Sequence, residues 1–133
     1  GDVLPTAASA KVGLDQILAS LVVLTRNGIS TAESVTAINN LLIHIIKPSE
    51  EAKKVFDQLG ISYGINALQA KGLTGVLQEI IDKTKGNKQA LSLLVPEIRG
   101  LKALFALTAE GGKGYKDALD QIGQSEGARA AAL

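Results

Sequence analysis

The chain contains one histidine and no cysteine, so few kinds of catalytic or metal site can be built from it. A serine or threonine nucleophile that needs a histidine base would have to use His44. His44 lies in the apolar run from Leu41 to Ile46, where we expect it to pack between helices. A zinc site would have to be completed by carboxylates, and the H-E-x-x-H spacing is absent. We therefore expect no catalytic residue, no metal site and no enzyme activity.

A second candidate for chemistry is the pair Asp117 and Asp120, which are one helical turn apart. Two carboxylates at this spacing could hold a hard cation or act as an acid and a base. Lys113 and Lys116 stand beside them, and Leu119 marks the opposite, apolar face of the same predicted helix. This pattern is typical of a solvated helix face.

Two glycine-rich stretches complete the candidates. Residues 111–114 read G-G-K-G, but Leu107 stands where a phosphate loop has its first glycine, and Gly114 stands where it has serine or threonine. Residues 72–75 read G-L-T-G, the spacing of some RNA-binding modules, without the basic surroundings and the sheet that those modules need. We expect both stretches to be breaks between helices, and we expect no cofactor.

The charge balance argues against a nucleic-acid partner. Fourteen Lys and Arg face 13 Asp and Glu, for a net charge of +1, and two Phe, two Tyr and no Trp leave few rings to stack on bases. The longest uncharged stretch, residues 34–46, is shorter than the ~20 residues that a membrane helix needs. The start of the chain does not read as a signal peptide. We expect no nucleic acid from this segment and no stable membrane insertion.

Apolar residues make up 46% of the chain, are mostly aliphatic and recur at helical spacing. This pattern predicts helices over 14–27 and 31–47, between Ser49 and Gly60, over 73–85, 88–94 and 96–108, and a last short helix around 115–122. Residues 61–71 are expected to form a loop or a short extended pair. The predicted fold is an all-α, compact bundle of about six or seven short helices without a substantial sheet.

Several residues are expected to cap or interrupt these helices. Ser30 and Glu33 fit a capping box, in which each side chain binds the amide of the other residue, and Asn87 can cap the helix over 88–94. Glycines can end helices in a left-handed conformation, and proline stops a helix or stands in its first turn. The expected caps and breaks are Gly28, Ser30, Glu33, Pro48, Ser49, Gly60, Gly86 and Pro96.

Two apolar faces are expected to be the main packing surfaces. The predicted helix over 31–47 carries a stripe of Val35, Ile38, Leu42 and Ile45 that its neighbours widen, which indicates contact with more than one helix. This stripe could be buried in the bundle, the favoured interpretation, or it could form an interaction face for another chain. The helix over 96–108 is expected to point four residues inward: Ile98, Leu101, Leu104 and Phe105.

The order of capped helix, proline, capped helix and L-G-I-S over residues 28–62 resembles the core region of phage tail tape measure proteins. The likeness continues on both sides. Residues 1–8 read G-D-V-L-P-T-A-A, residues 13–18 read G-L-D-Q-I-L, residues 24–30 read L-T-R-N-G-I-S, and residues 98–101 read I-R-G-L, followed by Ala103 and Leu104. Each motif is a capping or packing motif, so it is the order and spacing that carry the resemblance, which covers most of the chain.

The resemblance implies a structural and assembly role in the tail of a phage or prophage. Tape measure proteins act as ruler and scaffold inside the growing tail tube, so the implied functions are tail length determination and tube assembly. The implied partners are the tail tube protein, tail assembly chaperones and other copies of the chain. The implied locations are the virion tail and, during assembly, the cytoplasm of the bacterial host.

The resemblance also bears on domain organisation. We expect residues 1–133 to form one helical domain, a fragment of a longer tape measure protein, with residues 123–133 as a frayed or extended helical tail. A folded chain of this length is ~35 to 40 Å across, whereas one continuous helix would reach ~200 Å. The segment therefore either lies outside the measuring stretch, as an assembly domain, or loses its tertiary packing to enter the tube.

A different function remains open from the residues alone. The chain could be a helical interaction module that binds a partner helix through the helices over 31–47 and 73–85 and shares only capping patterns with the tape measure family. Contact with a host membrane has little support, because no predicted helix combines a strong apolar face with a basic one.

Overall fold

The computed structural model describes residues 3–132, and side chains from residue 6 to residue 124. The regular structure of these residues is helical without a strand, which confirms the predicted all-α bundle. Gly1, Asp2 and Leu133, which belong to the expected domain, lie outside the described residues. The elements are α1 (Val3–Ser9), α2 (Leu14–Arg26), α3 (Thr31–Ile46), α4 (Glu50–Leu59), α5 (Ile65–Thr84), α6 (Lys88–Leu94), α7 (Ile98–Thr108), the short 3₁₀ helix η1 (Ala109–Gly112) and α8 (Lys113–Ala132).

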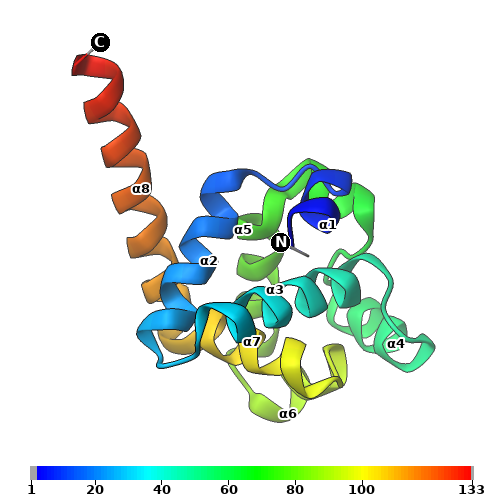
Figure 1. Cartoon of the computed structure of the whole chain (residues 1–133). Helices are drawn as coiled ribbons and strands as arrows, with labels where there is room; N and C mark the ends of the chain where they lie inside the picture. The colour runs from blue at the N-terminus through cyan, green and yellow to red at the C-terminus, as the bar shows by residue number, and fades with distance from the viewer. Residues whose placement is uncertain (1–2, 133) are drawn as a thin grey trace.

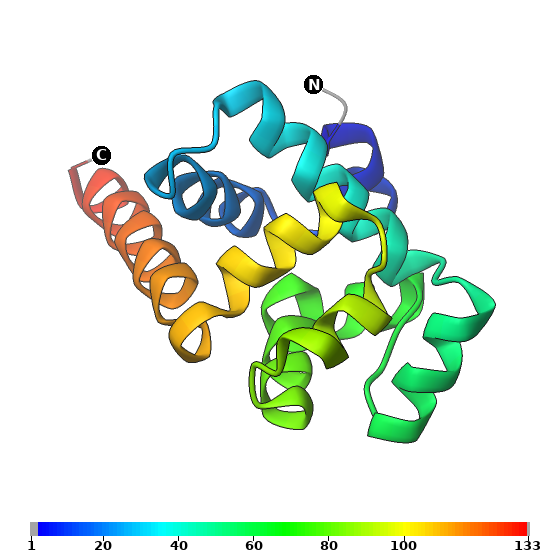
Figure 2. The same ribbon diagram turned by 90° about the horizontal axis from the view of Figure 1, so that it is seen from below.

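Two helices, α3 and α7, lie side by side through the middle of the bundle (Figures 1 and 2). Helix α2 packs on both of them, and α8 covers the outer side of α2. Helices α5 and α6 pack against α7, α1 packs on α3, and α4 lies next to α6 at the end of the bundle away from α8. The middle pair therefore joins the two ends of the fold.

The core is almost entirely aliphatic, as the composition indicated. Its main exception is Phe56, whose ring lies 5.2 Å from that of Tyr63 in a tilted arrangement. Twelve large, fully buried side chains come from five helices: Leu24, Ile38, Leu41, Leu42, Ile45, Phe56, Leu68, Leu73, Leu77, Ile80, Leu91 and Leu94. Burying each of them stabilises the fold by about 1.5 to 3 kcal/mol before the entropy of ordering is counted.

Gly100 allows α3 and α7 to approach closely. Its backbone N–H donates to Asn40 Oδ1 at 3.0 Å, across 60 positions of sequence. A Cβ atom at residue 100 would lie 2.9 Å from Val95 Cγ1 and 3.2 Å from the backbone nitrogen of Leu41. The backbone atom cannot move aside without shifting α3, so glycine is required at this position.

Side chains cap the starts of α3, α4 and α6, as predicted. Ser30 Oγ accepts from Glu33 N–H at 3.2 Å, Ser49 Oγ from Ala52 N–H at 3.1 Å, and Asn87 Oδ1 from Ala90 N–H at 2.9 Å. Helix α3 stops at Ile46, and the buried Pro48 follows. Among the predicted breaks, Gly28, Gly60 and Gly86 have positive φ values of 85°, 72° and 74°.

Glu33 makes only one half of the predicted capping box. Its N–H binds Ser30, but its carboxylate Oε2 lies 4.0 Å from Lys102 Nζ on α7. The second bond of the box is missing among the described residues. A long-range ion pair has replaced a local hydrogen bond.

The start of α7 differs from the prediction. Pro96 is exposed and precedes the helix, because Glu97 takes the capping position and its carboxylate accepts from Arg99 N–H at 2.9 Å. Ile98 is 70% exposed, so the expectation that it points inward was wrong. Gly100 occupies the side of the first turn that meets α3. Of the other residues expected inward, Leu101 and Leu104 are buried, whereas Phe105 is only half-buried.

Residues 61–71 also differ from the prediction, because Ile65 already begins α5. Gly72, with φ 68° and ψ 176°, then kinks this helix. The segment before the kink fully buries only Leu68, so too few apolar positions repeat for the helical period to be read.

The kink in α5 is bridged by polar side chains. Lys71 Nζ donates to Ser62 Oγ at 2.8 Å and pairs with Glu79, one helical segment further on. Glu79 Oε1 also accepts from Ser62 N–H at 3.0 Å. Burial acts to raise the pKa of Glu79, but these bonds outweigh it and leave that pKa below its usual value. The bonds therefore fasten the loop after α4 to both halves of α5.

Helix α1 was not predicted. The last helix was expected to be short, followed by a frayed or extended helical tail from residue 123, whereas α8 runs as one helix from Lys113 to Ala132. The break expected over 110–114 is a tight 3₁₀ turn with Glu110 and Gly111 in left-handed conformations.

The approach at Gly100 yields a prediction about stability. We expect Gly100→Ala to lower the free energy of unfolding by about 1 to 3 kcal/mol, because the new methyl group overpacks the contact between α3 and α7. Gly123→Ala is the matched control, since nothing lies within 4 Å of the added Cβ and alanine gains up to about 1 kcal/mol in a helix. Urea unfolding followed by circular dichroism measures both. A Gly100→Ala variant as stable as wild type would contradict the close approach.

Candidate functional site

His44 has a structural environment, not a catalytic one. It is half-buried, and its Nδ1 lies 2.9 Å from the backbone oxygen of Asn40, one turn earlier in α3. This bond fixes the ring against its own helix. Within residues 3–132, no group of three or more His, Cys, Asp or Glu side chains is placed to hold a metal ion.

The two aspartates of α8 are exposed. Asp117 Oδ2 accepts from Lys113 Nζ at 2.7 Å, four residues earlier in the same helix. Asp117 and Asp120 thus lie on a charged outer face. The hydrogen bond to the Asp117 carboxylate and the negative charge of that group raise the pKa of Lys113.

The two glycine-rich stretches form a helix kink and a turn. Residues 72–75 lie inside α5, where Gly72 forms its kink. Residues 111–114 join η1 to α8, and Gly112 packs so closely under Ile81 that a Cβ would lie 2.9 Å from Ile81 Cδ1.

The predicted interaction face is part of the core. Ile38, Leu42 and Ile45 have no exposed surface, and Val35 is partly buried against them. The partner helix of the alternative function would also have to reach α5, whose Leu73, Val76, Leu77 and Ile80 are buried as well. These faces are covered in the folded bundle, which agrees with the favoured interpretation that the stripe packs internally.

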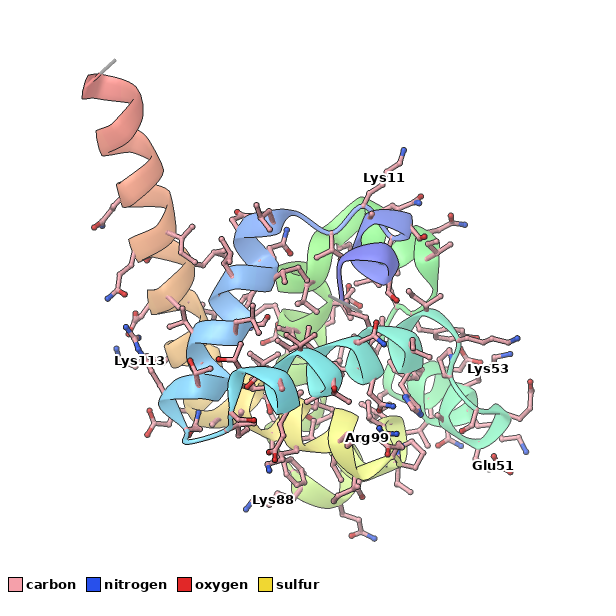
Figure 3. All side chains as sticks on the ribbon, viewed as in Figure 1. Lys11, Glu51, Lys53, Lys88, Arg99 and Lys113 are labelled. Carbon is pink, nitrogen blue, oxygen red and sulfur yellow. The ribbon has the colours of Figure 1, made fainter. Side chains whose placement is uncertain are left out.

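An open groove runs between the first half of α3 and the first two turns of α7. It encloses about 410 Å³. Ile29, Ala32 and Ala37 form an apolar side, and the charged groups of Glu33, Arg99 and Lys102 stand at the rim; the groove is also lined by Thr36. Arg99 is labelled in Figure 3, where it projects from α7. An apolar floor with a charged rim is typical of a surface that contacts another protein.

A second hollow of about 520 Å³ lies between the end of α5, the start of α6 and the end of α7. Lys88 and Phe105 are among its lining residues, and the Lys88 ammonium lies 5.7 Å from the centre of the Phe105 ring. Asp82 and Glu110 add negative charge beside Lys85 and Lys88, so the hollow carries no single sign of charge.

Charged side chains are spread around the molecule. Figure 3 shows Lys11, Lys53, Lys88 and Lys113 on different parts of the chain, pointing outward in different directions. Several large apolar side chains are also exposed, including Leu14 (61%), Leu93 (51%) and Ile98 (70%). In the part of the chain that the structure describes, no helix combines the length and the apolar character needed to cross a bilayer.

A polar cluster links α2, α5 and α8, and the sequence analysis missed it. Gln16 Oε1 accepts from Thr74 N–H at 3.0 Å, just after the kink at Gly72, and the Thr74 and Tyr115 hydroxyls are 2.8 Å apart. Tyr115 is only 3% exposed. The signal in the sequence was weak, because the three residues are far apart and none belongs to a motif. The cluster fixes the position of α8 on the bundle.

The comparisons with known proteins give one family. The model of phage-related minor tail proteins matches residues 1–95, which end just after α6. No curated protein and no solved structure matches the chain.

The polar cluster predicts how stability changes at alkaline pH. Burial raises the pKa of Tyr115 to about 12, the Thr74 hydrogen bond opposes this shift, and Asp15 adds to it. Below pH 10 both folded and unfolded chains keep the proton. Between pH 10 and 12 only the unfolded chain loses it, so the free energy of unfolding falls by roughly 2 kcal/mol.

Tyr115→Phe tests this. At neutral pH we expect the variant to be about 1 kcal/mol less stable than wild type, because the hydroxyl bond is gone. As the pH rises from 10 to 12, wild type loses roughly 2 kcal/mol and the variant does not, since phenylalanine cannot ionise, so the variant should be about 1 kcal/mol more stable than wild type at pH 12. Thr74→Val is the matched control, which removes the bond and keeps the phenol, so its alkaline loss should persist. If the free energies of unfolding of wild type and Tyr115→Phe fell in parallel between pH 10 and 12, the raised pKa of Tyr115 would be contradicted.

Proposed function

The chain belongs to the phage-related minor tail protein family, and from this premise we propose that it is a non-enzymatic segment of a tape measure protein that serves tail assembly as a folded domain. Family membership gives the chain a structural role in the phage tail and contacts with other tail components. The ordered resemblance to the tape measure core region supports the narrower role.

The observation that carries the proposal is the burial of α3. Ile38, Leu41, Leu42 and Ile45 have no exposed surface, and they are covered by helices from both ends of the chain. Running these residues as one extended helix would expose all four, at about 1.5 to 3 kcal/mol each, together with the rest of the core. Among the described residues the longest unbroken helix is α8, with 20 residues, or ~30 Å, since α5 is kinked at Gly72. A bundle of such helices is a poor ruler and a suitable docking domain.

We place the segment outside the measuring stretch of a longer tape measure protein. In this position it would contact the tail tube protein or a tail assembly chaperone while the tail forms. The groove between α3 and α7 is our proposed contact surface, because it has an apolar side and a charged rim and remains open when the core is closed.

Deletion of the segment tests its position. We expect an in-frame deletion from the parent gene to give fewer or no particles, with tails of normal length where tails form, because a folded domain adds no length to the ruler. Electron microscopy of tails and a count of infectious particles measure both effects. Tails shorter by ~200 Å would contradict the proposal, since they would mean that these residues run as extended helix.

Filling the groove tests the contact surface without touching the core. Ala32 is exposed and lines the groove, so Ala32→Trp should block a partner while leaving the bundle folded. The matched control is Ala70→Trp, at an exposed position of α5. We expect particle yield to fall at least tenfold for Ala32→Trp only. Equal yields for the two variants, with both chains folded by circular dichroism, would exclude the groove as the contact.

A further inference from the structure

Helix α8 lies on the outside of the bundle. It packs mainly along α2, and in Figure 1 its last turns point away from the body. Tyr115 and Ala118 are buried in this contact, and Leu119 and Ile122 are partly buried. One turn, η1, joins α8 to the central helix α7. The element is therefore attached to the fold by one turn and largely by one face.

The turn itself is conformationally unusual. Glu110, Gly111 and Gly112 follow one another with φ values of 53°, 67° and 80°, all in the left-handed region. Glutamate is strained there, because its Cβ lies too close to the following carbonyl oxygen. The turn is held closed by Lys116 Nζ, which donates to Gly111 O at 3.2 Å, and by Gly112 under Ile81.

We propose that two copies of this chain exchange α8. In the exchanged form the extended Ala109 and the three left-handed residues of the turn become helical, and α7 and α8 join into one helix over residues 98–132, ~52 Å long. Each α8 then packs on α2 of the other copy. Figure 2 shows that α7 ends at the edge of the bundle, so a helix continued along its axis leaves the body.

A second copy of this chain is the partner that fits, because its α2 offers α8 the same surface that α8 already covers in the single chain. The hydroxyl of Thr74, the side chain of Val23 3.9 Å from a Cβ at Gly114, and the Arg26 guanidinium near Gln121 would all be met again. No new complementary surface has to exist. Exchange of an identical element is a low-cost route to a dimer, and a short strained hinge favours it.

Two substitutions in the turn should move the equilibrium in opposite directions. Gly111→Ala has open space for its methyl group, so it affects the turn only by disfavouring the left-handed conformation and favouring the helix. We expect the substitution to disfavour the closed form of each turn by a factor of about ten. Two turns open for each dimer formed, so the association constant should rise roughly hundredfold. Glu110→Gly relieves the closed turn and should lower the constant by a similar factor.

Gly123→Ala is the matched control. It is the same substitution inside α8, again with open space, and it affects closed and exchanged forms equally. Sedimentation equilibrium over a range of concentrations measures the association constants. Gly111→Ala should form dimers at concentrations where Gly123→Ala and Glu110→Gly remain monomeric. Equal association of all three would overturn the proposal.

Crosslinking tells exchange from side-by-side association. The chain has no cysteine, so Arg26→Cys and Gln121→Cys introduce unique thiols at two exposed positions whose native side chains lie 3.4 Å apart. In the Gly111→Ala background, a short bis-maleimide should join two chains in the dimer fraction and one chain to itself in the monomer fraction. A dimer fraction that yields only internally linked single chains on a denaturing gel would overturn the proposal.

Discussion

The fold depends on how closely α3 and α7 approach at Gly100. The absence of a side chain there lets the N–H of Gly100 reach Asn40, and this contact lies between the two most central helices. Helix α7 packs against the buried aliphatic stripe of α3, and α2, α5 and α6 pack against this pair. Because the core contains few aromatic rings, its stability rests on many small, close contacts, and helix separation matters more than any single large side chain.

This arrangement separates the two properties that a tail protein segment needs. The apolar stripe of α3 is buried in the core, so the surface that we propose for partner recognition is the groove between α3 and α7. The peripheral helix α8 is a third region, fastened by the Gln16, Thr74 and Tyr115 cluster and by its apolar face on α2.

The sequence predicted those features that are encoded locally. A serine before a helix and a glycine after it cap helix ends in most proteins. The bounds of α2, α3, α4 and α6 therefore followed from the residues alone. Features set by distant contacts could not be read. Whether Ile98 or Gly100 faces α3 depends on a helix 60 positions away, the carboxylate of Glu33 turned from a local cap to Lys102, and the Tyr115 cluster joins three separated helices.

The 60 positions between Asn40 and Gly100 also set an order of events during synthesis. A ribosome that adds ~5 to 20 residues per second needs about 3 to 12 s to make the chain between them. For that interval α3 has been made but its central neighbour has not, and its aliphatic stripe is open to water and to other nascent chains. A segment built this way has a defined window in which a chaperone can hold it, and translation itself closes that window.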